Sequence, residues 1–444
     1  MTGVLVVGLV LHNVAMAQLW ELGVRGTTLD VAAAWKEALL LVALLVVSWK
    51  VRRLPAVAVA DVLAASYAAV IVVYWLIPQD VLGGEATARG ELLALRHHLL
   101  PVAGYALGRL VAVAWQERGR VGGLIVLSAV VVAVVGLLDI AFVSLQAWRD
   151  SGVPGWFAEQ LGLEYEGLSG LPENWVYNTG DEDNPIRRLV STFLSPLASA
   201  YTLVVALIYV VSRPPRWWWG LVGGLLYVAL LFTHTRAAFA ALAFGLVVLA
   251  IAQRRVLPAA IAAGAVVASA LFVVAYPAVG PSTSYTPGEL AWLRANAEQE
   301  GGISGGRFPT VEDESTESHW SNLREGARVV REHPQGFGLG NAGVVAKRTG
   351  VEIRAGESTY TELGVDAGIA GVAAFSLWSL ALLVGLWRRE AWLAAAFAAV
   401  LALALQTDVI GIHWLAFTVW FAAGLALGFP RVEVEPGEDA TVPP

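Results

Sequence analysis

The stretch Ser318–Gly371 reads SHWSNLREGARVVREHPQGFGLGNAGVVAKRTGVEIRAGESTYTELGVDAGIAG. It is the one long region in which charged residues, glycines and helix signals occur together between apolar segments. It separates a long series of apolar segments before it from a short series after it. We therefore look for functional residues in this stretch first.

A basic stripe is expected on a short helix at the start of this stretch. Ser321 is placed to cap that helix, which has to end before Pro334 because the residue preceding a proline is disfavoured in helical conformation. On it Arg324, Arg328 and Arg331 are spaced i, i+4 and i+7, so their guanidinium groups share one face. The stripe indicates an anion-binding face, and the alternative is a solvated face paired with neighbouring glutamates.

A glycine-rich loop and three carboxylates follow the stripe. The loop glycines predict a backbone that a ligand can approach closely: Gly336, Gly338, Gly340 and Gly343. The loop follows a helix instead of a strand and lacks the lysine spacing of a nucleotide-binding loop. Glu357, Glu362 and Asp366 then lead into the next apolar segment. Arginines facing carboxylates at a membrane edge suggest an anionic, lipid-linked substrate.

The composition indicates a polytopic membrane protein. Of 444 residues, 57% are hydrophobic and only 15% are charged, which is too apolar for an ordinary soluble protein. There are no cysteines, so disulfides and thiolate metal sites are excluded. The histidines lack metal-ligand spacing, and we expect no metal, no cofactor and no nucleic-acid partner.

The fold expected from the hydropathy pattern is all-α, with about 12 transmembrane helices, because a spanning helix needs about 20 mostly apolar residues. A large external loop containing short helices is expected between the ninth and tenth spans. The expected spans are 2–22, 31–49, 56–77, 97–115, 121–148, 188–212, 217–233, 236–252, 256–276, 361–387, 391–408 and 411–428.

Lysine and arginine in the short connections set the expected orientation. Five basic connections fall on one side of the membrane, which is therefore the cytoplasmic side: Lys50 with Arg52 and Arg53, Arg118 with Arg120, Arg213 with Arg216, Arg254 with Arg255, and Arg388 with Arg389. The regions 149–187 and 277–360 are then external. The chain divides into spans one to nine (1–276), the large external loop (277–360), spans ten to twelve (361–428) and a cytoplasmic tail (429–444), with both termini cytoplasmic.

Within the large loop, Thr286 and Glu289 have the spacing of a capping box with Pro287 at the first helical position, which predicts a helix to about Gln299. The run 301–317 is expected to be a flexible surface segment. At the chain start, Ala15-Met16-Ala17 resembles a signal-peptide cleavage site, but no lysine or arginine precedes the apolar run. We expect the first span to be retained.

Four stretches in order resemble the O-antigen ligase and O-antigen polymerase superfamily of bacterial integral membrane glycosyltransferases. They are RRLVSTFLSPLASAY (187–201), FTHTRAAFAALAFG (232–245), REHPQGFGLGNAG (331–343) and ESTYTELGVDAGIAG (357–371). The resemblance covers roughly residues 185–390. It implies a multi-pass protein of the bacterial cytoplasmic (inner) membrane whose large periplasmic loop precedes the last few spans.

The resemblance implies pyrophosphate contacts for Arg236 and for Arg188, with Arg187 as the alternative to Arg188. Planar, permanently charged guanidinium groups suit phosphate oxygens. The alternative for both arginines is an interface marker paired with the acidic residues of 181–183. The family commonly has a His-Asn pair where this sequence has Glu357 and Ser358.

Glu357 is the expected general base, and His319 is the nearest replacement for the family's histidine. The other diphosphate contacts expected are Arg324 and Arg328. Four further charges lie in apolar spans, where a charge is expensive and is normally paired: Lys36, Glu37, Arg109 and Asp139. The sequence leaves open whether they bind substrate or one another.

The function expected is a membrane glycosyltransferase that polymerises polyprenyl-diphosphate-linked oligosaccharide units, such as undecaprenyl-diphosphate-linked ones, at the external face, with loss of the diphosphate. The expected partners are that donor, a glycan acceptor, membrane lipids, and polysaccharide export or chain-length proteins. Glutamate in place of histidine favours polymerisation over O-antigen ligase-type transfer to a lipid or protein acceptor. The alternatives from other classes are a non-enzymatic transporter of the lipid-linked glycan and a structural scaffold for polysaccharide assembly.

Overall fold

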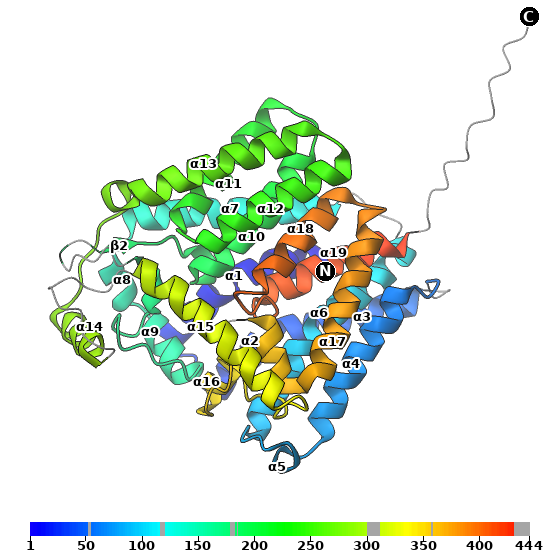
Figure 1. The fold of residues 1–444 in the computed structure, drawn as a ribbon, viewed down its shortest axis with the longest axis horizontal. Coiled ribbons are helices and arrows are strands. Elements are labelled where there is room, and N and C mark those ends of the chain that lie inside the picture. Colours follow the sequence, from blue (N-terminus) through cyan, green and yellow to red (C-terminus); the bar gives the residue numbers. More distant parts are fainter. Residues whose placement is uncertain are drawn as a thin grey trace, which may run out of the picture.

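The computed structural model describes residues 1–51, 55–115, 120–177, 183, 185–299, 311–356 and 358–429. Nearly all regular structure there is helical (Figure 1). The long apolar helices are α1 (Thr2–Glu21), α3 (Trp35–Lys50), α4 (Val59–Leu76), α6 (Ala88–Trp115), α7 (Arg120–Phe142), α10 (Pro196–Ser212), α11 (Trp217–Phe232), α12 (Arg236–Gln253), α13 (Val256–Val279), α17 (Thr359–Trp387), α18 (Ala391–Leu403) and α19 (His413–Gly428).

Shorter elements connect these helices. They are α2 (Thr27–Ala33), α5 (Gln79–Leu82), α8 (Leu145–Arg149), α9 (Val153–Gly155), a π-turn (Trp156–Gln160), two 3₁₀ turns (Glu173–Trp175 and Ser191–Phe193), α14 (Pro287–Gln299), α15 (Val311–Glu332) and α16 (Gly343–Thr349). The only sheet in the described residues pairs β1 (Val176–Tyr177) with β2 (Ile186–Arg187) in antiparallel fashion.

The expected all-α membrane architecture is confirmed in its coarse form. Six described helices are long and apolar enough to cross a membrane, and the number is seven if α2 and α3, bent by 40° at Ala34, form one span. Four shorter apolar helices, α10, α11, α18 and α19, add to them. Each expected span coincides with a helix, although several bounds differ: the helix expected from 188 begins at Pro196, and the one expected from 97 begins at Ala88.

The connections between the long helices gather at two ends of the bundle. One end, here called the long-connection side, comprises 22–26, 77–87, 143–177, 185–195, 233–235, 280–299, 311–356 and 404–412. These segments contact one another: Gln79 donates to the carbonyl of Leu339, Arg149 pairs with Glu289, and the Arg187 amide donates to the Pro281 carbonyl. At the other end Arg389 donates to the carbonyls of 427 and 429.

α6 packs closely against α19, and α4 packs against α17 and α6 on the same side of the bundle (Figure 1). At the α6–α19 crossing, a Cβ on Gly108 would lie 2.1 Å from the carbonyl oxygen of Phe421, and one on Gly424 would lie 2.1 Å from that of Tyr105. Only glycine permits this backbone approach, which is the usual basis of tight helix packing in membranes. The crossing fixes the position of the α6 side chains described below.

The charges expected in apolar spans pair with other protein groups. Arg109 pairs with Asp61 at 2.7 Å. The carboxylate of Asp139 lies 2.8 Å from Arg187. The Nζ of Lys36 lies 3.7 Å from a carboxylate oxygen of Glu37 and 3.0 Å from Nε2 of His12. This pairing is what a medium of low dielectric constant requires.

For the 277–360 loop, one expectation is confirmed and another is wrong. The capping box is confirmed, since the Thr286 amide donates to Glu289 and the Glu289 amide donates to the Thr286 hydroxyl. The expected helix start at Ser321 is wrong, because α15 begins at Val311. The acidic residues at 312–314 favour a helix N-terminus, so the helix starts about three turns earlier than a cap at Ser321 allows. Residues 301–310 lie outside the described residues.

The glycine-rich loop is packed against the bundle and is not open to a ligand, so that expectation is wrong. A Cβ on Gly336 would lie 2.5 Å from the amide nitrogen of Gly368, and one on Gly340 would lie 2.8 Å from the carbonyl carbon of Gly90. α17 is broken at Gly368, where φ is 61°. Two hydrogen bonds join the loop to this break: the Phe337 amide donates to the Val365 carbonyl, and the Ile369 amide donates to the Pro334 carbonyl. The loop glycines therefore allow the loop to pack on the helix.

Candidate functional site

Arg188 is held on the connection between α11 and α12. Its Nε donates to the carbonyl of Thr233 at 2.8 Å, and its Nη2 donates to the hydroxyl of Thr235 at 3.0 Å. The backbone beside it is also docked, because the Leu189 amide donates to the Phe232 carbonyl at 2.9 Å. The two motif segments 187–201 and 232–245, distant in sequence, therefore meet at this point on the long-connection side.

Arg187 and Arg188 have different surroundings. Arg187 is 3% exposed, and its guanidinium is engaged by Asp139 and the Val143 carbonyl. Arg188 is half-buried, donates only to neutral oxygens, and forms no ion pair with a carboxylate among the described residues. Two of the acidic residues expected as alternative partners, at 181 and 182, lie outside the described residues. Within the described residues Arg187 is already paired with Asp139, which favours Arg188 as the contact for an anionic ligand.

Arg236 is the first residue of α12 and lies at the helix N-terminus. Thr235, which occupies the capping position, forms no side-chain cap on α12 because its hydroxyl is used by Arg188 and the Thr233 carbonyl. A helix N-terminus carries partial positive charge and unpaired amides, which favour an anion. The guanidinium groups of Arg188 and Arg236 and the N-terminus of α12 therefore lie in the same region. The positive charge of Arg236 is near enough to lower the pKa of Arg188.

His234 lies between these two arginines and is 5% exposed. Its ring stacks on Tyr276 with a centroid separation of 4.3 Å and packs against Tyr177 at 4.4 Å. Its Nε2 is buried and has no hydrogen-bond partner among the described residues. Burial, followed by the charges of the two arginines, lowers the pKa of His234 to about 3, so the ring is neutral at physiological pH.

The electrostatics of the site favour a bound anion. Burial is the main reason that the pKa of Arg188 is lowered to about 10, and the nearby Arg236 adds to the effect. Arg188 remains charged at neutral pH, and an added anion would relieve the repulsion between the two guanidinium groups. The arrangement can bind and stabilise a phosphate or diphosphate group.

The basic stripe lies elsewhere, on α15. Arg328 is exposed and pairs with Glu325 at 2.8 Å and with Glu332 at 3.9 Å. Arg324 lies over the ring of Trp320 at 5.9 Å. No hydrogen bond or ion pair among the described residues joins either arginine to Arg188. The geometry of Arg328 is that of a solvated helix face, and the diphosphate role of both arginines stays a prediction.

The two expected base residues are only partly located. Glu357 lies outside the described residues, and for His319 the structure describes only its backbone position in α15. The residue after Glu357 is fixed, because the Ser358 hydroxyl donates to the Ala404 carbonyl at 3.1 Å. The start of α17 therefore lies against the connection between α18 and α19. The catalytic roles of Glu357 and His319 stay predictions.

Sequence reasoning missed two histidine–aspartate pairs next to this position. His97 Nε2 lies 3.0 Å from Asp408 Oδ2, and His98 Nε2 lies 3.0 Å from Asp366 Oδ2. A signal was present in the adjacent histidines at the start of an apolar span and in Asp408 between two apolar spans. Burial tends to raise the pKa of the Asp408 carboxyl, but the charge of His97 and its hydrogen bond lower it overall.

A hydroxyl pair lies between the arginine site and the His97–Asp408 pair. Tyr201 on α10 and Thr407 share a hydrogen bond of 2.8 Å between their hydroxyl oxygens. Tyr201 also belongs to the electrostatic surroundings of Arg188, and Thr407 precedes Asp408. The connection that carries Asp408 and the start of α10 near Arg188 are therefore joined by one hydrogen bond.

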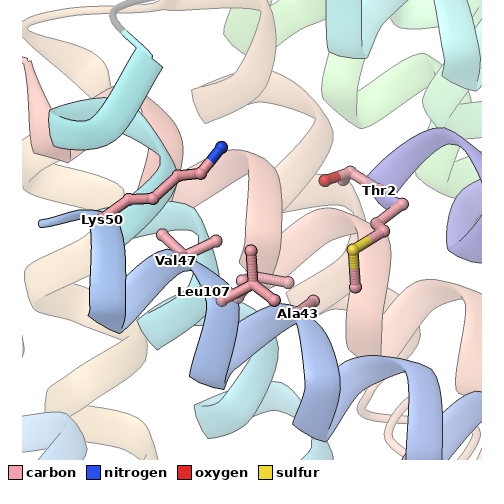
Figure 2. A pocket seen from close by; sticks show the side chains of 7 residues that line it. Thr2, Ala43, Val47, Lys50 and Leu107 are labelled. Atoms are coloured by element: carbon pink, nitrogen blue, oxygen red, sulfur yellow. The ribbon is translucent and has the colours of Figure 1, made fainter.

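A cavity of about 300 Å³ lies at the opposite end of the bundle (Figure 2). Its lining comes from the start of α1, the end of α3 and the middle of α6, and it is apolar apart from the Thr2 hydroxyl, the Lys50 amine and backbone atoms: Met1, Thr2, Ala43, Val46, Val47, Lys50 and Leu107. None of the expected site residues lines it. The cavity therefore plays no part in the arginine site.

Comparison of the chain with protein-family models and with curated proteins finds no match. The resemblance to the O-antigen ligase and polymerase superfamily therefore rests on the four quoted stretches, and what it implies is taken up as a proposal below.

Proposed function

We propose that the chain is an integral membrane glycosyltransferase that polymerises polyprenyl-diphosphate-linked glycan units at the outer face of the bacterial cytoplasmic membrane, with about 12 spans. One observation carries the proposal: Arg188, Arg236 and the uncapped N-terminus of α12 converge at one end of an apolar helical bundle. A lipid-linked donor would place its diphosphate at this end of the bundle, and its lipid tail would lie along the apolar helices.

The role of the arginines follows from the chemistry of the donor. Attack of an acceptor hydroxyl on the anomeric carbon releases the diphosphate, whose negative charge grows as the bond to carbon breaks. Preorganised donors aimed at this developing charge stabilise the transition state, and removing one such donor typically reduces the rate by about 10²–10³. His234, neutral and with Nε2 unpaired, is placed to contribute a further hydrogen bond.

The transporter alternative predicts a broken helix that lines a substrate path near the membrane midplane. α17 is broken at Ala367 and Gly368, but the backbone groups there bind the 334–337 segment: the Ile369 amide donates to the Pro334 carbonyl and the Phe337 amide to the Val365 carbonyl. The break is filled by protein. This favours the enzyme over the transporter.

The test uses purified protein in liposomes with a polyprenyl-diphosphate-linked oligosaccharide. The proposal predicts free polyprenyl diphosphate together with glycans of two or more repeat units. Movement of the intact donor across the membrane without cleavage would support the transporter. Transfer of the glycan only to an added lipid or protein acceptor would support the ligase-type reaction.

A further inference from the structure

The two histidine–aspartate pairs on α6 have the same ring-to-carboxylate distance but different accessibility. In the His98–Asp366 pair the side chains are 4% and 5% exposed, and in the His97–Asp408 pair they are 16% and 12% exposed. The difference arises from the helix faces on which the adjacent histidines lie. One pair is enclosed by protein, and the other, here called the open pair, is partly exposed.

The enclosed pair is fully occupied by structural contacts. His98 uses Nε2 for Asp366 and Nδ1 for the hydroxyl of Tyr67, at 3.0 and 3.3 Å. The second oxygen of Asp366 accepts hydrogen bonds from the amides of Gly340 and Asn341, both at 3.1 Å. This pair therefore anchors the glycine-rich loop to α6 and α17, and it has no nitrogen left for chemistry.

The open pair has a fixed carboxylate and an unused ring nitrogen. Asp408 Oδ1 accepts from the Ile410 amide at 3.1 Å and lies 3.4 Å from the Thr359 hydroxyl, while Oδ2 faces His97. Among the described residues no hydrogen-bond partner is found for Nδ1 of His97. A Cβ on Gly411 would lie 2.4 Å from Asp408 Oδ2 and 3.2 Å from His97 Cε1, so the glycine leaves room for the pair.

The open pair also lies beside the expected reaction centre. The Thr359 amide donates to the Ala404 carbonyl at 3.0 Å, so the first turn of α17 packs on the connection that carries Asp408. Thr407, one residue before Asp408, bonds to Tyr201 on α10, whose preceding segment carries Arg188. The Tyr201–Thr407 hydrogen bond thus places the segment that carries Asp408 on the same side of the bundle as Arg188.

We infer that His97 is the base that takes the proton of the acceptor hydroxyl and that Asp408 is a positioning residue that orients the imidazole; the inference rests on the proposed glycosyl transfer. The acceptor oxygen forms the bond to the donor anomeric carbon. The bond from that carbon to the diphosphate oxygen breaks, and its electron pair leaves with the diphosphate. The hydroxyl proton moves to Nδ1 of His97, and the Asp408 carboxylate stabilises the imidazolium.

The first test compares His97→Gln with the matched control His98→Gln in the liposome assay. His97→Gln should lose roughly 10²–10⁴ in transfer rate, as expected for a positioned base, while the folded variant keeps parental donor binding. His98→Gln should mainly lower thermal stability. Transfer by folded His97→Gln at the parental rate would overturn the inference and leave the proposed function intact. Parental donor binding by a variant lacking both Arg188 and Arg236 would instead count against the proposed function.

The second test concerns Asp408, whose role as a positioning residue predicts a change in the pH profile of transfer. The charged or titratable groups near His97 are Asp408, Asp366, Arg96, His98 and His413. Asp408→Asn removes the carboxylate that favours the imidazolium, so the acidic limb of the profile should move to lower pH. A lower rate with an unmoved limb would contradict the role.

If Asp408→Asn does not fold, Gly411→Ala provides the same readout. Its added methyl group crowds Asp408 Oδ2 and shifts the carboxylate, while the chemical identity of both residues of the pair is unchanged. We expect a reduced rate with a displaced acidic limb in this variant. A parental pH profile and rate in a folded Gly411→Ala protein would contradict the inference.

Discussion

The neighbouring residues Arg187 and Arg188 offer a matched pair for separating structure from function. Arg187→Met leaves Asp139 buried at 5% exposure without its cation. Removing one partner of a buried ion pair destabilises a protein by about 3–5 kcal/mol, which lowers the folded-to-unfolded ratio roughly a hundredfold to several thousandfold. We therefore expect a large loss of thermal stability in this variant, measured on detergent-purified protein.

Among the described residues, Arg188→Met leaves no carboxylate unpaired, because the guanidinium donates to the Thr233 and Asn174 carbonyls and the Thr235 hydroxyl. The expected loss of stability is about 1–3 kcal/mol, the range for one unsatisfied buried acceptor. Donor affinity should fall by about 1.5–3 kcal/mol, or roughly 10- to 150-fold, because one charge-assisted contact is lost. Binding of a fluorescent polyprenyl-diphosphate glycan measures this change.

Arg188→Lys should recover part of the affinity, since lysine keeps the charge but lacks the planar fork. The affinity of the parent protein should be constant near neutral pH, because Arg188 keeps its charge there. Equal effects of Arg187→Met and Arg188→Met in both the stability and the binding assay would refute the assignment.

Three further predictions address topology, packing and the remaining base candidate. A cysteine at Gly170 should react with an impermeant reagent from outside and one at Arg254 only after permeabilisation; external labelling at Arg254 would overturn the orientation. Gly340→Ala should destabilise the protein more than Gly350→Ala, since both have positive φ but only Gly340 meets neighbouring backbone; equal melting temperatures would show that the loop is not tightly packed. Glu357→Gln should transfer glycan at close to the parental rate if His97 is the base, and a loss of roughly 10²–10⁴ would return that role to Glu357.

The sequence predicts the helices well because their signal is local. About 20 apolar residues bounded by basic or glycine-containing connections define a span wherever they occur. The Thr286–Glu289 capping box was equally local and is confirmed. The start of α15 was misplaced because a good cap at Ser321 was given more weight than the helix-favouring acidic residues before it.

The candidate site depends on contacts that the sequence does not contain. Arg188 and Arg236 were selected by motif, but the choice of Arg188 over Arg187 needed the position of Asp139, 48 residues earlier. The glycine-rich loop looked open because glycine permits both ligand approach and backbone packing. Asp408 was missed because its partner, His97, lies on a distant helix that α19 brings close through the α6 crossing.

The central claim is that Arg188 and Arg236 act on the departing diphosphate of a lipid-linked glycan donor. The most direct measurement is single-turnover release of polyprenyl diphosphate by the parent protein and by the double variant Arg188→Met Arg236→Met, with donor saturating in both. The claim predicts release by the parent and a loss of at least about 10²–10³ in rate for a folded double variant. Release at the parental rate by that variant, or no release by the parent with a competent acceptor present, would contradict it.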